Sequence, residues 1–157
     1  MTDTDTTLLT ERASAAFVID LAHLRHDDEA LAVAFGKAIR ALDAMIFERT
    51  GHRINPASVQ RRNITQRTDF PTGKRRYEVT YRPICVVLLG GPCDGRTFDV
   101  DVAEDEPMHP YVRAQSLERS PRWPAVVTER INTYIPAGID VARDRWVFTY
   151  GHGRRSA

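Results

Sequence analysis

The chain has 157 residues and a formal net charge of +1 at pH 7, with 42% hydrophobic and 27% charged residues. This length and composition predict one domain, residues 1–157, with a sizeable core, and the small net charge excludes a strong general attraction to nucleic acid. No apolar run approaches the roughly 20 residues of a membrane helix, and the acidic, Thr-rich start lacks the pattern of a secretory signal.

The N-terminal third is predicted to be a flexible leader, residues 1–7, followed by a helical part, residues 8–50. In residues 8–25, a stripe formed by Ala13, Ala16 and Phe17 with Leu21 or Leu24 favours a first helix. The β-branched residues within 17–19 leave a short strand as the alternative.

The clearest helical pattern begins at Asp27 or Asp28, either of which can cap it, and runs to about Arg49. Its apolar residues recur every three or four positions: Leu31, Phe35, Ala38, Ile39, Leu42, Met45 and Ile46. Gly51 follows as the residue that ends the helix.

Residues 52–150 are predicted to be rich in β-structure, and residues 52–82 carry eight basic residues against two acidic ones. An edge strand is predicted in residues 59–68 and an alternating strand in residues 76–82. This segment is the best binding candidate, because Arg and Lys contact phosphates or acidic protein surfaces and Tyr stacks on bases. Its candidate residues are Arg61, Arg62, Lys74, Arg75, Arg76, Tyr77 and Tyr81.

The central feature is a predicted β-hairpin, in which the apolar run 84–89 is joined to the alternating run 97–102. The turn is marked by Gly90, Gly91, Pro92, Asp94 and Gly95. These residues nearly match the phosphate-binding GxxxxGK[ST] loop. However, Arg96 replaces the lysine and the following residues alternate as a strand, whereas that loop must open a helix.

The remaining chain contains an irregular excursion, residues 103–124, with one helical turn predicted near residues 114–119. Strands are predicted in residues 125–135 and 146–150, with a turn at residues 136–138 between them, and residues 151–157 form a flexible tail. Trp123, Trp146 and Tyr150 are candidate interface residues, because aromatic side chains dominate interaction energies; core burial is the alternative for the last two.

In sum, the pattern predicts an α+β fold: two N-terminal helices packed on a mainly antiparallel sheet of five or six strands. Cys85 and Cys93 would not face each other across the hairpin, so both are predicted to be reduced thiols. His23 and His26 are more typical of helix-end residues than of metal ligands. We predict no catalytic residue, no metal and no cofactor.

The stretch LLGGPCDGRTFDV, together with the terminal WVFTYGH, resembles small proteins of actinobacteria and their tailed phages that carry a GGPxDG hairpin. The resemblance covers residues 86–102 and 146–152. It implies a hairpin and a lineage, and no reaction.

Together these features predict a non-enzymatic protein that acts through protein–protein contacts or self-assembly, as a virion or assembly component or a host-directed accessory protein. It is expected in the cytoplasm or associated with a virion. The alternative is a nucleic-acid-binding accessory protein that uses residues 52–82.

Overall fold

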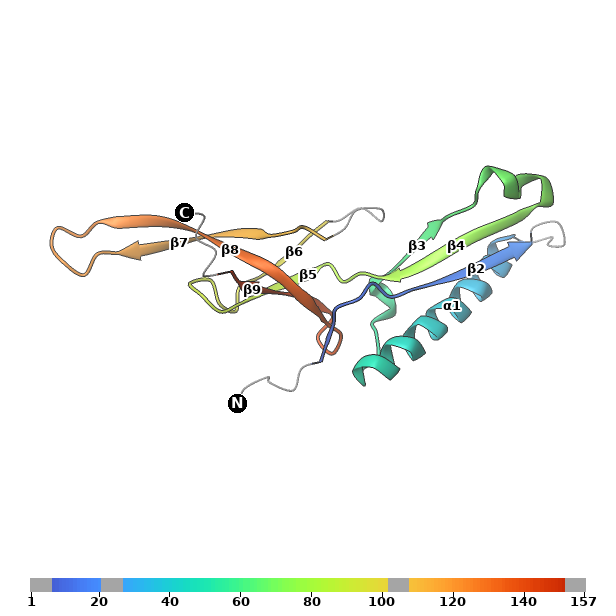
Figure 1. Cartoon of the computed structure of the whole chain (residues 1–157), viewed down its shortest axis with the longest axis horizontal. Helices are drawn as coiled ribbons and strands as arrows, with labels where there is room; N and C mark the ends of the chain where they lie inside the picture. Colours follow the sequence, from blue (N-terminus) through green and yellow to red (C-terminus); the bar gives the residue numbers. More distant parts are fainter. Residues whose placement is uncertain (1–6, 21–26, 102–107, 152–157) are drawn as a thin grey trace. The chain divides into compact units, whose positions relative to one another are not determined.

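The computed structural model describes residues 7–20, 27–101 and 108–151 (Figure 1). Within these ranges the chain forms nine strands, one α-helix and two short 3-10 helices. Its internal contacts divide it into two compact units. The first comprises residues 1–83 with 141–144, and the second comprises residues 84–140 with 145–157.

The first unit is built on a three-stranded antiparallel sheet in the order β2–β4–β3. Its strands are β2 (Ser14–Asp20), β4 (Lys74–Tyr81) and β3 (Val59–Asn63). The helix α1 (Asp27–Thr50) packs along β2 and β4 (Figure 1). The unit also contains β1 (Leu8–Leu9) and the 3-10 helices η2 (Pro56–Ser58) and η3 (Arg67–Thr72).

The sequence pattern predicts α1 correctly. Leu42 and Ile46 are fully buried, as the apolar stripe requires. Gly51 takes a left-handed φ of 76°, and its N–H donates to the Phe47 carbonyl at 2.7 Å. A glycine adopts this conformation without a steric penalty, so the helix ends where predicted.

The predicted first helix in residues 8–25 is wrong, because this segment forms β1 and β2. β2 pairs antiparallel with β4, with Phe17 opposite Tyr77 and Ile19 opposite Arg75. This pairing joins residues about sixty positions apart, and such a partner overrides the helical preference of an alanine-rich segment. The predicted α+β fold with two N-terminal helices is therefore wrong, and the protein is mostly β with one long helix.

The second unit is a mixed sheet made by five strands. They are β5 (Cys85–Leu89), β6 (Thr97–Asp99), β7 (Val112–Arg119), β8 (Val127–Asp140) and β9 (Arg145–Tyr150). β5 lies between antiparallel β6 and parallel β9, while β8 pairs with β7 through its first half and with β9 through its second half. The core contains Val86, Leu88, Tyr134 and Phe148, all fully buried.

The predicted central hairpin is confirmed as β5 and β6, with Cys85 opposite Asp99. Neither Cys85 nor Cys93 forms a disulfide. The turn is closed by the Gly95 N–H, which donates to the Leu88 carbonyl at 2.7 Å, and by the Gly90 N–H, which donates to Asp94 Oδ1 at 2.6 Å.

Two predictions in the C-terminal third are wrong. Residues 114–119 form part of β7 rather than a helical turn, because they pair with residues 127–132 of β8. The predicted turn at residues 136–138 is a bulge within the continuous strand β8, between Pro136 and Gly138. A bulge is one of the few places where a strand tolerates proline. In the first unit, the predicted strand at residues 59–68 is shorter than predicted, because β3 ends at Asn63.

Residues 1–6 and 152–157 of the predicted leader and tail lie outside the described residues. Neither α1 nor any other helix in the described ranges has the length and hydropathy to cross a membrane.

Candidate protein-interaction surface

The outer part of the β7–β8 hairpin is a two-stranded ribbon, residues 115–131, which we call the arm (Figure 1). Its strands have only each other as neighbours in the second unit, because β9 pairs with β8 from Tyr134 onward. The Ser120 N–H donates to the Val126 carbonyl at 2.8 Å and closes the connecting loop. The arm is therefore an extended element that buries little of its own surface.

One face of the arm carries an exposed apolar stripe. Leu117 lies opposite Glu129, which places it diagonally between Ile131 and Val127 on the same face. The exposed fractions are 71% for Leu117, 62% for Ile131 and 55% for Val127. Single exposed apolar residues are common, but three in a contiguous row are typical of a contact surface.

The opposite face of the arm is polar. Ser116 lies opposite Arg130, and Arg130 forms an ion pair with Glu118 on that face. Toward the base of the hairpin, this same face becomes the core face, with Ala114, Asn132 and Tyr134. The apolar stripe thus lies on the side of the ribbon that points away from the core of its own unit.

The connecting loop adds further exposed apolar surface. Trp123, predicted as an interface residue, is 91% exposed, and Val126 in the same loop is also exposed. Arg113 and Arg119 share the face of the stripe and lie toward its two ends, whereas Glu129 lies opposite Leu117, between Val127 and Ile131. Charged residues at the margin of exposed apolar side chains are typical of a protein-binding surface.

Asn132 and Tyr134 hold the base of the arm. The buried Asn132 amide donates to the Ala114 carbonyl at 3.1 Å and to Ser116 Oγ at 2.8 Å. The Tyr134 hydroxyl donates to the Gly90 carbonyl at 2.7 Å and accepts from the Cys93 N–H at 2.9 Å. Burial raises the pKa of Tyr134 above its ordinary value, so the phenol stays protonated in the neutral range.

The predicted basic residues belong to β3 and β4 and point to both faces of their sheet. Arg61, Arg75 and Tyr77 share the face of the buried Val79, and Arg62, Lys74 and Arg76 share the other. Several are engaged within the unit. Arg61 lies over the Phe35 and Tyr77 rings, Arg75 over the Phe70 ring, and Arg62 3.6 Å from Glu78.

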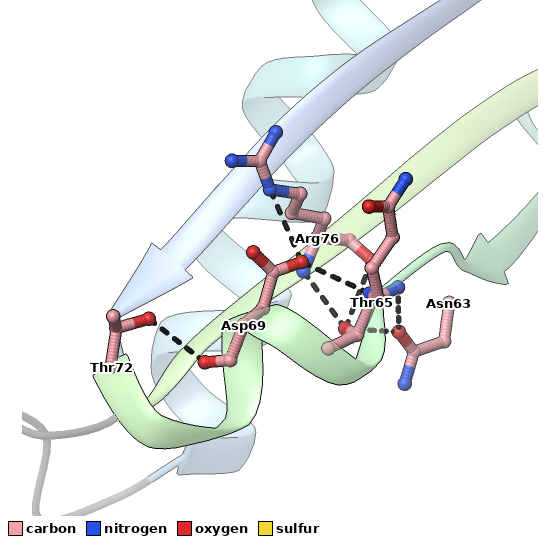
Figure 2. Close-up of polar contacts among 6 residues, drawn as sticks. Asn63, Thr65, Asp69, Thr72 and Arg76 are labelled. Atoms are coloured by element: carbon pink, nitrogen blue, oxygen red, sulfur yellow. Dashed lines mark hydrogen bonds and ion pairs between the residues drawn. The ribbon is translucent and has the colours of Figure 1, made fainter.

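Arg76 belongs to a local polar network in the β3–β4 connection, as Figure 2 shows. Its Nε lies 3.4 Å from Asp69 Oδ2, and its backbone N–H donates to Thr65 Oγ1 at 3.0 Å. Asp69 also accepts from the Gln66 N–H at 3.0 Å, and Thr65 donates to Asn63 Oδ1. The guanidinium therefore helps to fix this connection.

The other predicted aromatic residues are partly or fully covered. Tyr81 is buried, and its hydroxyl donates to Asp144 Oδ1 at 2.8 Å. Trp146 and Tyr150 are half-buried and pack against the core of the second unit. Trp146 and Tyr150 belong to the second unit, whereas Tyr81 and the basic residues of β3 and β4 belong to the first.

In the described residues, no three His, Cys, Asp or Glu side chains gather in a way that could hold a metal ion. His23 and His26 lie outside those residues. The glycine-rich turn leads into β6, so it has no following helix whose amides would hold phosphate.

Comparison with protein-family models, with curated proteins and with solved structures finds no match to this chain. The candidate site therefore depends on the geometry of the chain itself.

Sequence reasoning missed Leu117, Val127 and Ile131 as interface residues. The alternation of the predicted strand did carry a signal, because it places Val127 and Ile131 on one face and Tyr134 on the other. To decide which of the two faces packs against the core, the partner strand β7 must be known, and the sequence predicts that segment as irregular.

Proposed function

We propose that this protein is non-enzymatic and acts through protein–protein contacts, with the apolar face of the arm as its docking surface. It serves as a component of a virion or similar assembly, or as an accessory protein directed at a host partner. The observation that carries the proposal is the apolar stripe on the face of the arm that points away from the core.

The energetics of burial support this function. Burying an exposed Leu, Ile or Val side chain contributes about 1.5–3 kcal/mol, from which the costs of association are subtracted. Leu117, Ile131 and Val127 leave most of this contribution unused in their own unit, because each is more than half exposed there. A partner that covers the stripe and Trp123 would bury these apolar side chains at the centre of the interface. Aromatic side chains are frequent among the residues that dominate binding.

Site-specific photocrosslinking in cells that produce the protein tests the proposal. A photoreactive phenylalanine analogue at Leu117 lies on the apolar face, and the same analogue at Thr128 lies on the polar face of the same arm. We expect an adduct of one dominant mass from position 117 and little from position 128. An adduct with a second copy identifies self-assembly, and one with another protein identifies the partner. Equal adducts from both positions, or none from position 117, would contradict the proposal.

A nucleic-acid-binding accessory protein that uses residues 52–82 is the second candidate. It has less support because Arg62 and Arg76 lie in ion pairs and Arg61 and Arg75 lie over aromatic rings. If this function holds, affinity for DNA or RNA falls steeply with salt, and reversing the charges of these four arginines abolishes it. Binding that survives the charge reversal would exclude this surface.

A further inference from the structure

The apolar face of the arm carries charges in a fixed order beside its stripe. From the base of the hairpin toward its tip, Arg113 comes first, Glu129 second and Arg119 third. All three side chains are exposed, and none of them forms an ion pair with a described residue. The ion pair of Arg130 with Glu118 lies on the polar face instead. The apolar face therefore presents positive, negative and positive charge to a partner.

The spacing of these charges follows from the strands that carry them. Arg113 and Arg119 lie six residues apart in β7, which is about 20 Å at about 3.3 Å per residue. Glu129 is level with Leu117, so it lies within the apolar stripe and nearer to Arg119 than to Arg113. The order is thus asymmetric, with about 13 Å on one side of the carboxylate and about 7 Å on the other.

The same face of a second copy does not match this order. If two arms packed face to face in opposite directions, apolar residues would cover one another only with Leu117 on Leu117 and Ile131 on Val127. That register sets Glu129 against Glu129 of the second copy. If the two arms ran in the same direction about a two-fold axis, Leu117 would lie on Glu129. A carboxylate at the centre of an interface without a counter-charge opposes association, so both arrangements are disfavoured.

A ligand of uniform negative charge does not match the order either. Nucleic acid or an anionic lipid surface would attract the two arginines, but it would also bring negative charge against Glu129. Within the hydrocarbon part of a membrane, the same carboxylate would be buried without a hydrogen-bond donor, which is costly. A protein surface can meet all three groups, because it can present acidic and basic side chains next to one another.

We propose that the arm binds another protein, whose contact surface carries the opposite order of charges around an apolar centre. Two carboxylates about 20 Å apart meet Arg113 and Arg119, and a lysine or arginine between them meets Glu129. The apolar centre supplies most of the affinity, while the charges select the partner and fix its direction along the arm. This assignment rests on the docking surface proposed above and adds the chemistry of its partner.

Charge reversal in the photocrosslinking experiment tests this chemistry. With the photoreactive analogue at Leu117, the double variant Arg113→Glu with Arg119→Glu should lower the adduct yield about tenfold or more, because like charges then meet at both ends. Glu129→Lys should lower the yield too, whereas a uniformly anionic ligand would bind that variant more strongly. As a control, Arg130→Glu reverses an arginine of the polar face and should leave the yield unchanged. Circular dichroism of each variant checks that the fold is retained.

The crosslinked site on the partner provides a second test. Fragmentation mass spectrometry locates the partner residue joined to position 117, and acidic residues should flank it on the partner's surface. Replacing those acidic residues with lysine should restore the adduct with the doubly reversed arm. An adduct with a second copy, an adduct that survives the reversals, or a charge exchange that restores nothing would overturn the inference and leave the arm as a docking surface. The absence of any adduct at position 117 would overturn both proposals.

Discussion

At the scale of single residues, Tyr134 connects the glycine-rich turn to the strand that carries the arm. It is fully buried, and its hydroxyl bonds both the Gly90 carbonyl and the Cys93 N–H. The turn itself was predictable, because Asp94 and Gly95 are a strong local signal. The role of Tyr134 was not, since it lies about forty residues further along and no local pattern links the two.

Removing this hydroxyl should destabilise the second unit. Tyr134→Phe leaves the Cys93 N–H, on a buried residue, without its acceptor, and the Gly90 carbonyl without its donor. We expect the free energy of unfolding to fall by about 1–3 kcal/mol, the usual penalty for such groups. Urea denaturation at pH 7 measures it. An unchanged midpoint would show that water replaces both bonds.

The same residue predicts a pH dependence. The pKa of Tyr134 is raised in the folded state, chiefly by burial, so the folded protein holds this proton more tightly than the unfolded chain does. The resulting stabilisation is fully present below the unfolded value of about 10 and is lost as the pH rises through the folded value. Between pH 9 and 11.5, wild type should lose more unfolding free energy than Tyr134→Phe. If the unfolding free energies of the two proteins fell equally over this pH range, the prediction would be contradicted.

Two glycines of the turn provide a matched comparison. Gly91 and Gly95 have φ values of 63° and 82°, so alanine is strained at both. At Gly91 an added Cβ would lie 2.6 Å from the Tyr150 ring, whereas at Gly95 it would meet nothing within 4 Å. Gly95→Ala should cost about 1–2 kcal/mol, the conformational penalty alone. Gly91→Ala should cost more. Equal losses in thermal denaturation would exclude the contribution of Tyr150.

At the scale of elements, the sequence correctly predicted the helix and the hairpin that are held by contacts between residues close in the chain. The helix α1 follows from its apolar spacing and from Gly51, and β5 and β6 follow from an apolar run, a turn and an alternating run. β2 was misread because its alanines favour a helix and its partner β4 is remote in sequence. β7 was misread because Arg, Gln, Ser and Glu have little intrinsic strand preference, and only pairing with β8 makes them a strand.

The two faces of the arm should respond differently to substitution. Ile131 lies on the exposed face and Asn132 on the buried face, although they are adjacent in β8. Ile131→Thr should change the free energy of unfolding by less than about 0.5 kcal/mol, as surface substitutions usually do. Asn132→Ala should reduce it by about 1–3 kcal/mol, because bonds to Ala114 and Ser116 are lost. A large loss at Ile131 would mean that the stripe stabilises the fold itself.

At the scale of the whole molecule, a four-residue insertion completes the first unit. Residues 141–144 lie between β8 and β9 in the chain, yet they belong to the first unit. Asp144 has a left-handed φ of 53° and accepts bonds from Tyr81, Ser58 and Asn55, at 2.8, 2.6 and 2.9 Å. Three bonds to one carboxylate can hold a conformation that a non-glycine residue otherwise avoids.

Losing this carboxylate should weaken the first unit in particular. Asp144→Ala removes both acceptor oxygens, and with them all three bonds, and it keeps the backbone strain, so amide hydrogen exchange in β3 and β4 should accelerate. Asp144→Asn, which keeps one acceptor oxygen, should have a smaller effect. If exchange in β3 and β4 were the same in all three proteins, Asp144 would have no such role.

The insertion of residues 141–144 also determines how this protein can be divided. The chain passes from one unit to the other at 83/84, at 140/141 and at 144/145, so no single cut separates two complete units. A fragment that ends at residue 83 lacks Asp144, and a fragment that starts at residue 84 carries Asp144 without its three donors. Recombination at one point within the gene would break the first unit. The two units are therefore expected to be inherited and exchanged as one piece.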